Sequence, residues 1–534
     1  MPDARQAMEG MLNERDDVCW SMLFWLVLLA VTLFRIWFLY CLKLDLSPDE
    51  AYYWDWSRHL SWGYYSKPPM VAWLIWFFSS MLGHSSFAVR LPAALLGSVT
   101  IVCLYFLGRW MFNVRIGFWA AMGFLATLGS ALASMIMTID APLLCFWSLS
   151  MAATWKAWRS SFDDNGRSIA WWLLAGFVTG LGLLSKQTMA GFTIGMILFL
   201  LLSMEGRRLL TSRFPWIWLI TQALVIFPVL VWNYHHGWIT FQHTAHHFKP
   251  ASAGFPDFQT FFELMGSQLG IVTPVIFVLI TVLSLCLLWQ LVCGMLQRKS
   301  LHLQAHEHVR AYLLVFGILP LLAVFILALR QRINANWPAP FYLSSAILVS
   351  SWAMGGLDCR SAVDRLRKFF VPGIGLGLAL VAAFYLLPVA LNAFDLAGSR
   401  LDPTVRLRGW HELGLEAGRL LEQFPSPGKA FVVARRRQTA SELAFYMPGQ
   451  PEVYRWNGRK RHITSQYELW PGPVDRKGQD ALMIFEDASE LSEDLVSCFE
   501  QVKYMKKIVI PLGHGHERIF YAYQGVHMRH WADR

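Results

Sequence analysis

Two carboxylates and a lysine lie in one short polar stretch that directly follows a long apolar segment. Asp49 and Glu50 follow Pro48, and Lys67 precedes the pair Pro68-Pro69. A carboxylate at a membrane surface can act as a general base that accepts a proton from an attacking hydroxyl, and a lysine can hold a phosphate as a point charge. The structural alternatives are a charged first turn of a helix for the two acids and a lysine that extends to the membrane interface.

A second pair of ionisable residues interrupts the apolar part of the chain. Asp140 precedes Ala141-Pro142 at an expected turn, and Lys186 lies between two apolar segments with almost no loop. Ionisable groups at a membrane are costly unless they are paired, so such residues are candidates for function. We expect Lys186 either to pair with Asp140 or to contact an anionic ligand.

A histidine-rich loop is the third candidate. The segment 233–266 holds five of the sixteen histidines, namely His235, His236, His243, His246 and His247. Imidazoles can bind a metal ion, but this spacing matches no strong metal-binding motif. Solvated loop histidines are therefore the simpler interpretation.

The composition predicts that helices embedded in a membrane carry these residues. Of the 534 residues, 55% are hydrophobic and 15% are charged, whereas soluble domains carry charge at about 25% of positions. Apolar runs of about 20 residues, enough to cross a hydrocarbon core of about 30 Å, recur along the chain. We predict spans near 20–42, 87–108, 116–137, 141–157, 169–185, 187–204, 215–232, 267–293, 311–329, 336–354 and 369–391. The predicted fold class is a polytopic α-helical membrane protein with about 11 to 13 transmembrane helices.

The basic residues predict the orientation of these spans. The formal net charge is +10, but most Lys and Arg residues lie in alternate loops, as the positive-inside rule requires. The charge therefore does not indicate nucleic-acid binding. Segment 69–82 would be about 21 Å long as a helix, too short to cross, and we interpret it as an interfacial helix. The loops that hold Asp49, Asp140 and Lys186 then share the outer face.

The predicted domain organisation has three parts. Residues 1–19 form a cytoplasmic tail, 20–391 a transmembrane catalytic domain, and 392–534 an α/β domain outside the membrane. Within the second part, 43–86 is an outer loop with the interfacial helix, and 233–266 is another outer loop. In the third part, apolar and β-branched content predicts strands over 429–434, 481–485, 507–511 and 518–523 and a helix over 438–447.

Two further features indicate structure rather than chemistry. The run Arg435-Arg436-Arg437 favours a solvated basic face, with contact to acidic sugars or phosphates as the alternative. The eight cysteines lie mostly inside apolar runs and form no CxxC motif. We therefore expect small buried thiols rather than disulfides or a zinc site.

Several segments resemble a known family of membrane enzymes. The sequences PDEAYYW (48–54), GYYSKPP (63–69) and AVRLP (88–92) resemble the signature of polyprenyl-phosphate-sugar-dependent glycosyltransferases of the GT-C type. Segments 138–142, 184–186, 336–340 and 465–470 resemble further stretches of the bacterial members. The family includes protein O-mannosyltransferases, the lipid A aminoarabinose transferase and the rhizobial lipopolysaccharide galacturonosyltransferases.

The resemblance implies a GT-C fold and a reaction at the periplasmic face of the bacterial inner membrane. A sugar on an undecaprenyl-type phosphate would be transferred with inversion to lipopolysaccharide, lipid A or another envelope glycolipid. A protein acceptor is the alternative within this fold, and a lipid or sugar transporter is the alternative from another class. The candidate residues gather on one face, whereas transporters place substrate groups near the midplane of the membrane, and this favours the enzyme.

The resemblance also implies roles for individual residues. The catalytic set is Asp49, Glu50 and Asp140; the donor-phosphate set is Lys67, Tyr64, Lys186 and Arg332; and the possible substrate contacts are His236 and Tyr342. In this scheme Asp49 is the catalytic carboxylate, Glu50 and Asp140 help to position the donor or the acceptor, and Lys67 stabilises the charge of the leaving phosphate.

One residue bears on the need for a metal. The aminoarabinose transferase has a glutamate immediately before the lysine, associated with a metal, whereas Ser66 occupies that place here, as in the galacturonosyltransferases. We therefore expect no metal, with a divalent cation as the alternative. The expected partners are a polyprenyl-phosphate-linked sugar, a glycolipid or protein acceptor and membrane lipids, without nucleic acid.

Overall fold

The computed structural model describes residues 2–162, 167–246, 256–296, 305–359, 361–458 and 463–531. Its contacts divide the chain into two compact units. We name them the helical unit (Met1–Tyr40, Leu91–Gly237 and Thr244–Phe384) and the mixed unit (Cys41–Arg90, Trp238–His243 and Tyr385–Arg534). The stretch with Asp49 and Lys67 therefore belongs to the same unit as the C-terminal residues. His247, from the predicted histidine cluster, lies outside the described residues.

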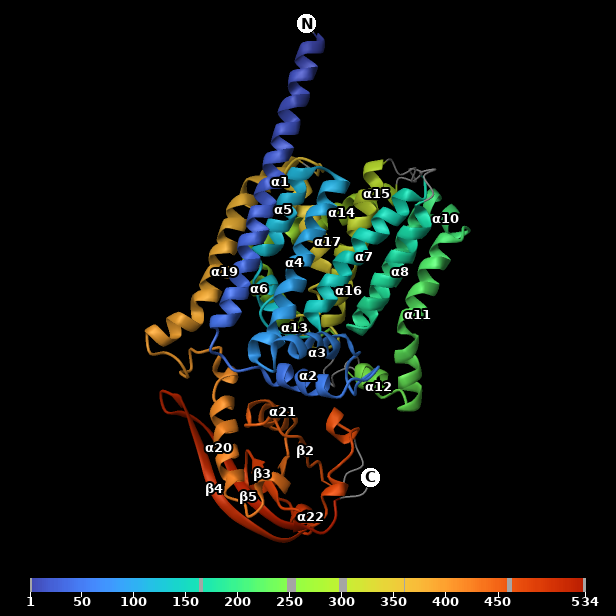
Figure 1. Cartoon of the computed structure of the whole chain (residues 1–534). Helices are drawn as coiled ribbons and strands as arrows, with labels where there is room; N and C mark the ends of the chain where they lie inside the picture. Colours follow the sequence, from blue (N-terminus) through green and yellow to red (C-terminus); the bar gives the residue numbers. More distant parts are fainter. Residues whose placement is uncertain are drawn as a thin grey trace. The chain divides into compact units, whose positions relative to one another are not determined.

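The helical unit is built from apolar helices. They are α1 (Pro2–Cys41), α4 (Ser86–Met111), α5 (Val114–Leu125), α6 (Leu128–Ala133), α7 (Asp140–Ser160), α8 (Ser168–Leu183), α9 (Ala190–Leu202), α10 (Met204–Leu210), α11 (Phe214–His235), α12 (Ile239–His246), α13 (Phe258–Val272), α14 (Pro274–Leu296), α15 (Ala305–Leu313), α16 (Leu319–Ala328), α17 (Phe341–Ala353), α18 (Ser361–Asp364) and α19 (Phe370–Ala393), of which α1, α4, α12 and α19 continue into the mixed unit. Figure 1 shows α7 and α8 running alongside each other.

Small residues allow two of these helices to approach closely. A Cβ at Gly176 of α8 would lie 2.6 Å from the Cβ of Thr221 in α11, and one at Gly180 would lie 2.6 Å from the Cβ of Val225. Two glycines four residues apart form the small-residue seam that membrane helices use for packing, because backbones there can come within contact distance. The pair α8–α11 therefore packs as membrane helices do.

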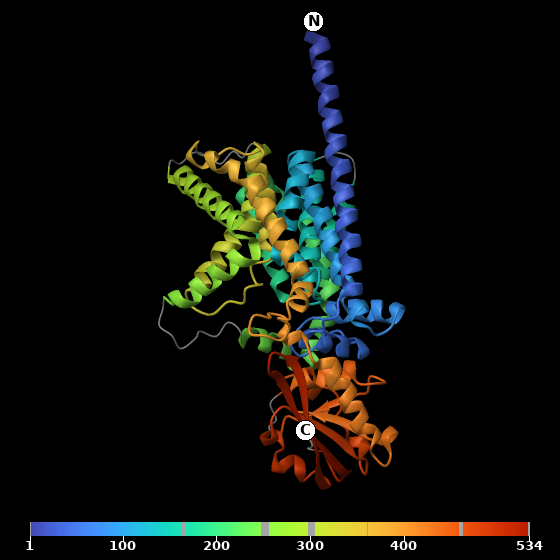
Figure 2. The same cartoon turned by 90° about the vertical axis from the view of Figure 1, so that its left-hand side faces the viewer.

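Two predicted spans contain a break in the helix. The segment predicted as one span at 267–293 is divided at Thr273, whose φ is 73°, and the axis turns by 117° between α13 and α14; Figure 2 shows this bend. The segment 116–137 ends as α5 at Leu125 and resumes as the short α6. Apolar periodicity continues across both breaks, so the sequence pattern does not reveal them.

Helix length gives fewer candidate crossings than the predicted 11 to 13. Among the described residues, five helices are long and apolar enough to cross a membrane, or seven if each of two bent pairs forms one span. Helices such as α8 and α17, predicted as spans, are 16 and 13 residues long. The number of crossings stays a prediction.

One disulfide differs from the expectation of reduced cysteines. Cys286 of α14 and Cys359, after α17, are joined in the structure. These residues are 73 positions apart in sequence, and they meet because α14 packs on α17. Spacing along the chain could not indicate this contact.

The mixed unit contains helices and one sheet. Its elements are α2 (Pro48–Arg58), α3 (Met70–Leu82), α20 (Trp410–Glu422), α21 (Arg437–Tyr446), α22 (Glu493–Val496), β1 (Phe431–Ala434), β2 (Val453–Arg455), β3 (Ala481–Phe485), β4 (Phe499–Gly513) and β5 (His516–Met528). Among the described residues the strand order is β2-β1-β3-β5-β4, with β1 parallel to β2 and β3, and β5 antiparallel to β3 and β4. α2 packs on α21 within this unit (Figure 1).

The strands confirm most of the predicted C-terminal elements. β1 and β3 lie where apolar runs predict them, and every residue of both strands is buried. β4 and β5 are longer than predicted and form a hairpin; β4 is largely exposed, and its polar residues hide the strand pattern, whereas most of β5 is buried or half-buried. His514 and Gly515 have φ values of 50° and 74° at its tip, as a tight hairpin turn requires. The short β2 was not predicted.

Candidate active site

The start of α2 fixes the backbone around Asp49. Ser47 is the N-cap, and Pro48 occupies the first turn. The Ser47 side chain accepts a hydrogen bond from the Glu50 backbone N–H (3.3 Å), and the Glu50 carboxylate accepts one from the Ser47 N–H (2.9 Å). This reciprocal capping box satisfies two backbone donors at the helix start, so Asp49 sits on a well-defined turn.

The Glu50 side chain points into the interior of the protein and binds Arg90 there. Its side chain has no exposed surface, and Arg90 donates to both carboxylate oxygens, from Nε at 2.9 Å and from Nη2 at 3.0 Å. Arg90 also donates to the backbone carbonyls of Leu44 and Asp45. A buried carboxylate with this bidentate partner is not available to a substrate. The geometry favours a positioning role for Glu50 in place of the predicted catalytic one.

Asp49 faces outward and has a partner from the C-terminal part of the chain. Its side chain is 56% exposed, and Arg437 of α21 donates to its carboxylate at 2.9 Å. The Arg437 guanidinium lies 4.6 Å from the ring centroid of Tyr52, one turn along α2. Burial lowers the pKa of Arg437, but the charge of Asp49, the hydrogen bond to it and the nearby Tyr52 and Tyr53 together outweigh this, and the net pKa is raised. Arg437 is therefore a firmly charged counter-ion.

The backbone and the ring of Tyr64 stabilise the turn that carries Lys67. The Tyr64 backbone N–H donates to the Lys67 carbonyl at 3.2 Å, and the Tyr64 ring stacks on Trp56 with centroids 4.4 Å apart. Lys67 is partly exposed at this turn. The Tyr64 hydroxyl is buried, accepts from the Ser61 N–H and lies 3.1 Å from two backbone carbonyls, to which it donates. Tyr64 therefore supports the turn, and its hydroxyl is not positioned for the predicted contact with a phosphate.

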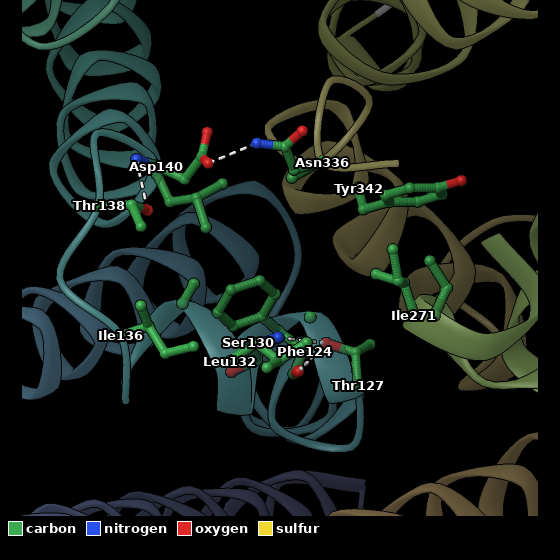
Figure 3. A pocket seen from close by; sticks show the side chains of 15 residues that line it. Phe124, Thr127, Ser130, Leu132, Ile136, Thr138, Asp140, Ile271, Asn336 and Tyr342 are labelled. Atoms are coloured by element: carbon green, nitrogen blue, oxygen red, sulfur yellow. Dashed lines mark hydrogen bonds between the residues drawn. The ribbon is translucent and has the colours of Figure 1, made fainter. Parts of the chain in front are cut away.

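The helical unit holds a second polar cluster around Asp140. Lys186 Nζ lies 2.7 Å from Asp140 Oδ1, and the Asn336 amide donates to Asp140 Oδ2 at 2.6 Å. Figure 3 shows Asp140 and Asn336 facing each other from different elements. Of the two expectations for Lys186, the structure realises the ion pair with Asp140. Both oxygens of Asp140 are engaged, so this carboxylate is not poised as a base.

A cavity opens beside this cluster. It has a volume of about 190 Å³ and is lined mainly by apolar side chains, with Asp140, Thr138 and Asn336 among its polar residues (Figure 3). Tyr342, a predicted substrate contact, also lines it. The Tyr342 hydroxyl is buried and finds no hydrogen-bond partner among the described residues. A cavity with apolar walls and a few polar groups suits an amphiphilic ligand.

The remaining predicted residues lie apart from these clusters. Arg332 pairs with Glu263 at 3.2 Å and is 81% exposed. His236 stacks on Trp232 with centroids 3.9 Å apart and is exposed. Neither shares a hydrogen bond or an ion pair with Asp140 or Lys186 among the described residues. Their predicted roles stay predictions.

No metal centre emerges from the part of the chain that the structure describes. Within it, no group of three or more His, Cys, Asp or Glu side chains could hold a metal ion. The need for a metal at the Lys67 turn stays a prediction.

The structure adds one residue to the Asp49 site of the mixed unit and one to the Asp140 cluster of the helical unit, and the sequence singled out neither. Arg437 belongs to the arginine run interpreted as a solvated face, and Asn336 belongs to a family-like segment without an assigned role. In the run, Arg436 pairs with Glu486 (2.5 Å) and Glu490 (2.8 Å). Arg436 is nevertheless 51% exposed, as the solvated-face interpretation expects, whereas Arg437 is 27% exposed and pairs with Asp49. Arg437 and Asp49 are 388 positions apart and meet only in the folded protein, so no motif in the sequence could identify this pair.

Glu442 is a buried acid close to the site. It lies on α21 with no exposed surface, and neither carboxylate oxygen accepts a hydrogen bond from a described residue. Burial, and then the negative charges of Asp45 and Glu50, raise the pKa of Glu442 well above its ordinary value of 4.5, although Arg518 and Arg90 oppose the shift. Burial without a hydrogen-bond partner therefore favours the protonated form of Glu442 in the folded protein.

We expect Glu442→Gln to stabilise the protein at pH 8 and to have little effect at pH 5. Above pH 4.5 the unfolded chain releases the proton, whereas the raised pKa makes the folded protein hold it to higher pH. The free energy of unfolding therefore falls as pH rises toward the folded pKa. Glutamine does not ionise, so the variant lacks this loss of stability. Thermal unfolding in detergent across this pH range measures it, and a difference in Tm that does not change with pH would contradict the assignment.

Comparison with known families finds glycosyltransferases. The family model described as dolichyl-phosphate-mannose-protein mannosyltransferase matches residues 66–232. The lipid A galacturonosyltransferase RgtD of Rhizobium johnstonii is 28% identical over 325 residues, which cover 60% of this chain and 64% of the relative. The undecaprenyl phosphate-alpha-4-amino-4-deoxy-L-arabinose arabinosyl transferase 2 of Pseudomonas fluorescens is 27% identical over 157 residues, 27% of this chain and 28% of the relative. The chain thus matches less than two thirds of the length of both curated relatives.

Comparison with solved structures identifies the fold. The crystal structure of apo ArnT from Cupriavidus metallidurans matches with a TM-score of 0.60 at 13% identity, covering 95% of this chain and 98% of that one. The structure of the same protein bound to undecaprenyl phosphate matches with a TM-score of 0.54 at 15% identity and the same coverage. These matches confirm the GT-C fold, and with the sequence relatives they confirm the resemblance predicted from the motifs.

Proposed function

We propose that this chain, which has the GT-C fold and resembles the polyprenyl-phosphate-sugar-dependent glycosyltransferases, transfers a sugar from a polyprenyl phosphate to an envelope glycolipid. The observation that carries the proposal is the exposed Asp49 carboxylate at the capped start of α2, with Arg437 as its counter-ion. Reaction at the periplasmic face of a bacterial inner membrane is part of the proposal.

In the proposed reaction, Asp49 accepts the proton of an acceptor hydroxyl that attacks the anomeric carbon of the sugar. The bond between this carbon and the phosphate oxygen breaks, and polyprenyl phosphate leaves. A carboxylate within hydrogen-bond reach of the hydroxyl is suited to this task. Arg437, at 2.9 Å, holds the Asp49 side chain in one orientation, which supports catalysis because the base must be aligned with the attacking oxygen.

Lys67 is the proposed ligand of the donor phosphate. It is partly exposed at a turn that is braced by the Tyr64 backbone and ring. A fixed ammonium group stabilises the charge that develops on a leaving phosphate and needs little reorganisation during the reaction.

We propose that the cavity beside Asp140, within the helical unit, takes an apolar lipid chain. Its walls are largely apolar, as a hydrocarbon requires. Asp140 and Lys186 form an ion pair there, so Lys186 would reach a phosphate only by sharing or leaving Asp140. We therefore assign this cluster to shaping the cavity rather than to the chemical step.

Lipid A or lipopolysaccharide is the acceptor that we favour. RgtD is named as a lipid A transferase, which supports this acceptor. The arabinosyl transferase is named for undecaprenyl phosphate, which supports the donor. The match of residues 66–232 to the mannosyltransferase family supports a protein acceptor as the second candidate. Mass spectrometry of envelope glycolipids from a deletion strain, with and without the complementing gene, tests the choice. Unchanged glycolipids beside a lost protein glycan would favour the second candidate.

We expect Lys67→Ala to weaken binding of the lipid-linked donor by about 10- to 100-fold, as loss of a charge-assisted contact predicts. Calorimetry with polyprenyl phosphate and purified protein in detergent measures the affinity. Lys477→Ala, which removes an exposed lysine of the C-terminal part, is the matched control and should bind normally. Unchanged affinity in the Lys67 variant would refute the phosphate role.

A further inference from the structure

One buried residue, Gln466, contacts both parts of the proposed active site: the helix that carries Asp49 and the turn that carries Lys67. Gln466, which is 3% exposed, lies in the 3₁₀ turn Gln466–Glu468. Its backbone N–H donates to the hydroxyl of Tyr52 on α2. Its side-chain Oε1 accepts from the backbone N–H of Tyr65 at 2.7 Å. Tyr52 is three residues after Asp49, and Tyr65 is two residues before Lys67.

The turn that carries Gln466 is itself rigid. Ser465 and Glu468 form a reciprocal capping box, and Arg455 donates to Glu468 at 2.6 Å. The next residue, Tyr467, donates its hydroxyl to Asp55 of α2 at 2.7 Å. Gln466 is thus anchored on the C-terminal side, and its position does not follow from the Lys67 turn alone.

We propose that Gln466 is a positioning residue that sets the distance between the Asp49 helix and the Lys67 turn. The inference rests on the proposed function, in which Asp49 takes a proton while Lys67 holds the leaving phosphate. Both groups must act on one sugar at the same time, and a displacement of about 1 Å can cost about 100-fold in rate. A single residue bonded to the Tyr52 side chain on α2 and to the Tyr65 backbone beside Lys67 is suited to prevent such a displacement.

The two hydrogen bonds of Gln466 differ in how they can be removed. The bond from Tyr65 ends on the glutamine side chain, so Gln466→Met removes its acceptor with little change of volume, whereas Gln466→Glu keeps an oxygen acceptor. The bond to Tyr52 starts from the Gln466 backbone, so only Tyr52→Phe removes it. Gln524→Met is the matched control, because Gln524 donates to Asp480 at 2.9 Å elsewhere in the mixed unit.

The test measures kcat, the Kd for polyprenyl phosphate and Tm for each purified variant. We expect Gln466→Met and Tyr52→Phe to lower kcat about 10- to 100-fold and to change the donor Kd less than about 3-fold, since Lys67 keeps its local turn. Gln466→Glu should retain kcat within about 3-fold, and Gln524→Met should resemble the wild type.

Three outcomes would overturn the inference. These are a wild-type kcat in Gln466→Met, an equal loss of kcat in Gln466→Glu at unchanged Tm, and an equal loss of kcat in the Gln524→Met control. If Asp49→Asn and Lys67→Ala impair the reaction while Gln466→Met does not, the positioning role fails and the proposed function stands. If Asp49→Asn is fully active, the proposed active site itself fails.

Discussion

Replacing Asp49 by asparagine is expected to lower the rate of sugar transfer by about 1,000-fold, because general-base catalysis contributes about 10²- to 10⁴-fold. The amide has nearly the same shape as the carboxylate but cannot accept the proton of an acceptor hydroxyl. Asp49 is 56% exposed and pairs, among the described residues, with Arg437, which the asparagine side-chain oxygen can still contact, so folding should be unaffected. Single-turnover transfer by purified variants measures the effect.

Asp475→Asn is a suitable control for this substitution. Asp475 is exposed in a 3₁₀ turn of the C-terminal part, and its replacement makes the same chemical change away from α2. Its transfer rate and its Tm should match those of the wild type. Full activity of Asp49→Asn would remove Asp49 from the mechanism, even if the fold and the donor were correctly assigned.

Breaking the Glu50–Arg90 pair should have the largest effect on stability. Both side chains are almost completely buried, at 0% and 2% exposure, and are joined by two hydrogen bonds. Removal of one member of a buried ion pair leaves an uncompensated charge and costs about 3–5 kcal/mol. We therefore expect Glu50→Gln and Arg90→Met to lower the Tm strongly and to reduce activity through loss of the folded protein.

The double variant Glu50→Leu with Arg90→Met distinguishes a buried pair from a catalytic acid. Apolar replacement of both partners removes both buried charges, so stability should recover part of the loss. Arg419→Ala breaks a pair with Glu416 in which the arginine is 71% exposed, and should cost less than about 1 kcal/mol. A Tm near the wild-type value in Glu50→Gln, with transfer lost, would instead assign Glu50 to catalysis.

Most helices and strands were predictable because each one leaves a hydrophobic pattern in its own segment of the sequence. Apolar runs indicate membrane helices, and the strands β1 and β3 coincide with apolar β-branched runs that are buried on both faces. The breaks at Thr273 and after Leu125 were missed, since a hydrophobic run looks the same whether the helix continues or bends. The length of β4 was missed for the opposite reason, because exposed strands lose their hydrophobic pattern.

The candidate site was predictable in its residue types and less so in its partners. Asp49, Lys67, Asp140 and Lys186 could be selected as ionisable groups next to apolar segments, and the pairing of the last two was one of two stated expectations. Glu50 is adjacent to Asp49 yet points into the interior toward Arg90. Adjacent residues on a helix face different directions, so two neighbouring acids need not share a function.

The contribution of the C-terminal residues could not be read from the sequence. Arg437 reaches Asp49 across 388 positions, and Gln466 reaches Tyr65 across 401. Asp45, before α2, accepts hydrogen bonds from the first backbone N–H groups of α20. The C-terminal residues of the mixed unit thus brace the Asp49 helix, a role that the prediction of a separate α/β domain did not include.

The most direct measurement for the proposed function is transfer by the purified wild-type protein in lipid nanodiscs. The substrates are a polyprenyl-phosphate-linked sugar and lipid A, and mass spectrometry follows both products. The proposal predicts that lipid A gains the mass of one sugar while an equal amount of polyprenyl phosphate is released, and that Asp49→Asn forms neither product. Sugar transfer that proceeds equally in the Asp49→Asn protein, or release of polyprenyl phosphate without a glycosylated acceptor, would contradict it.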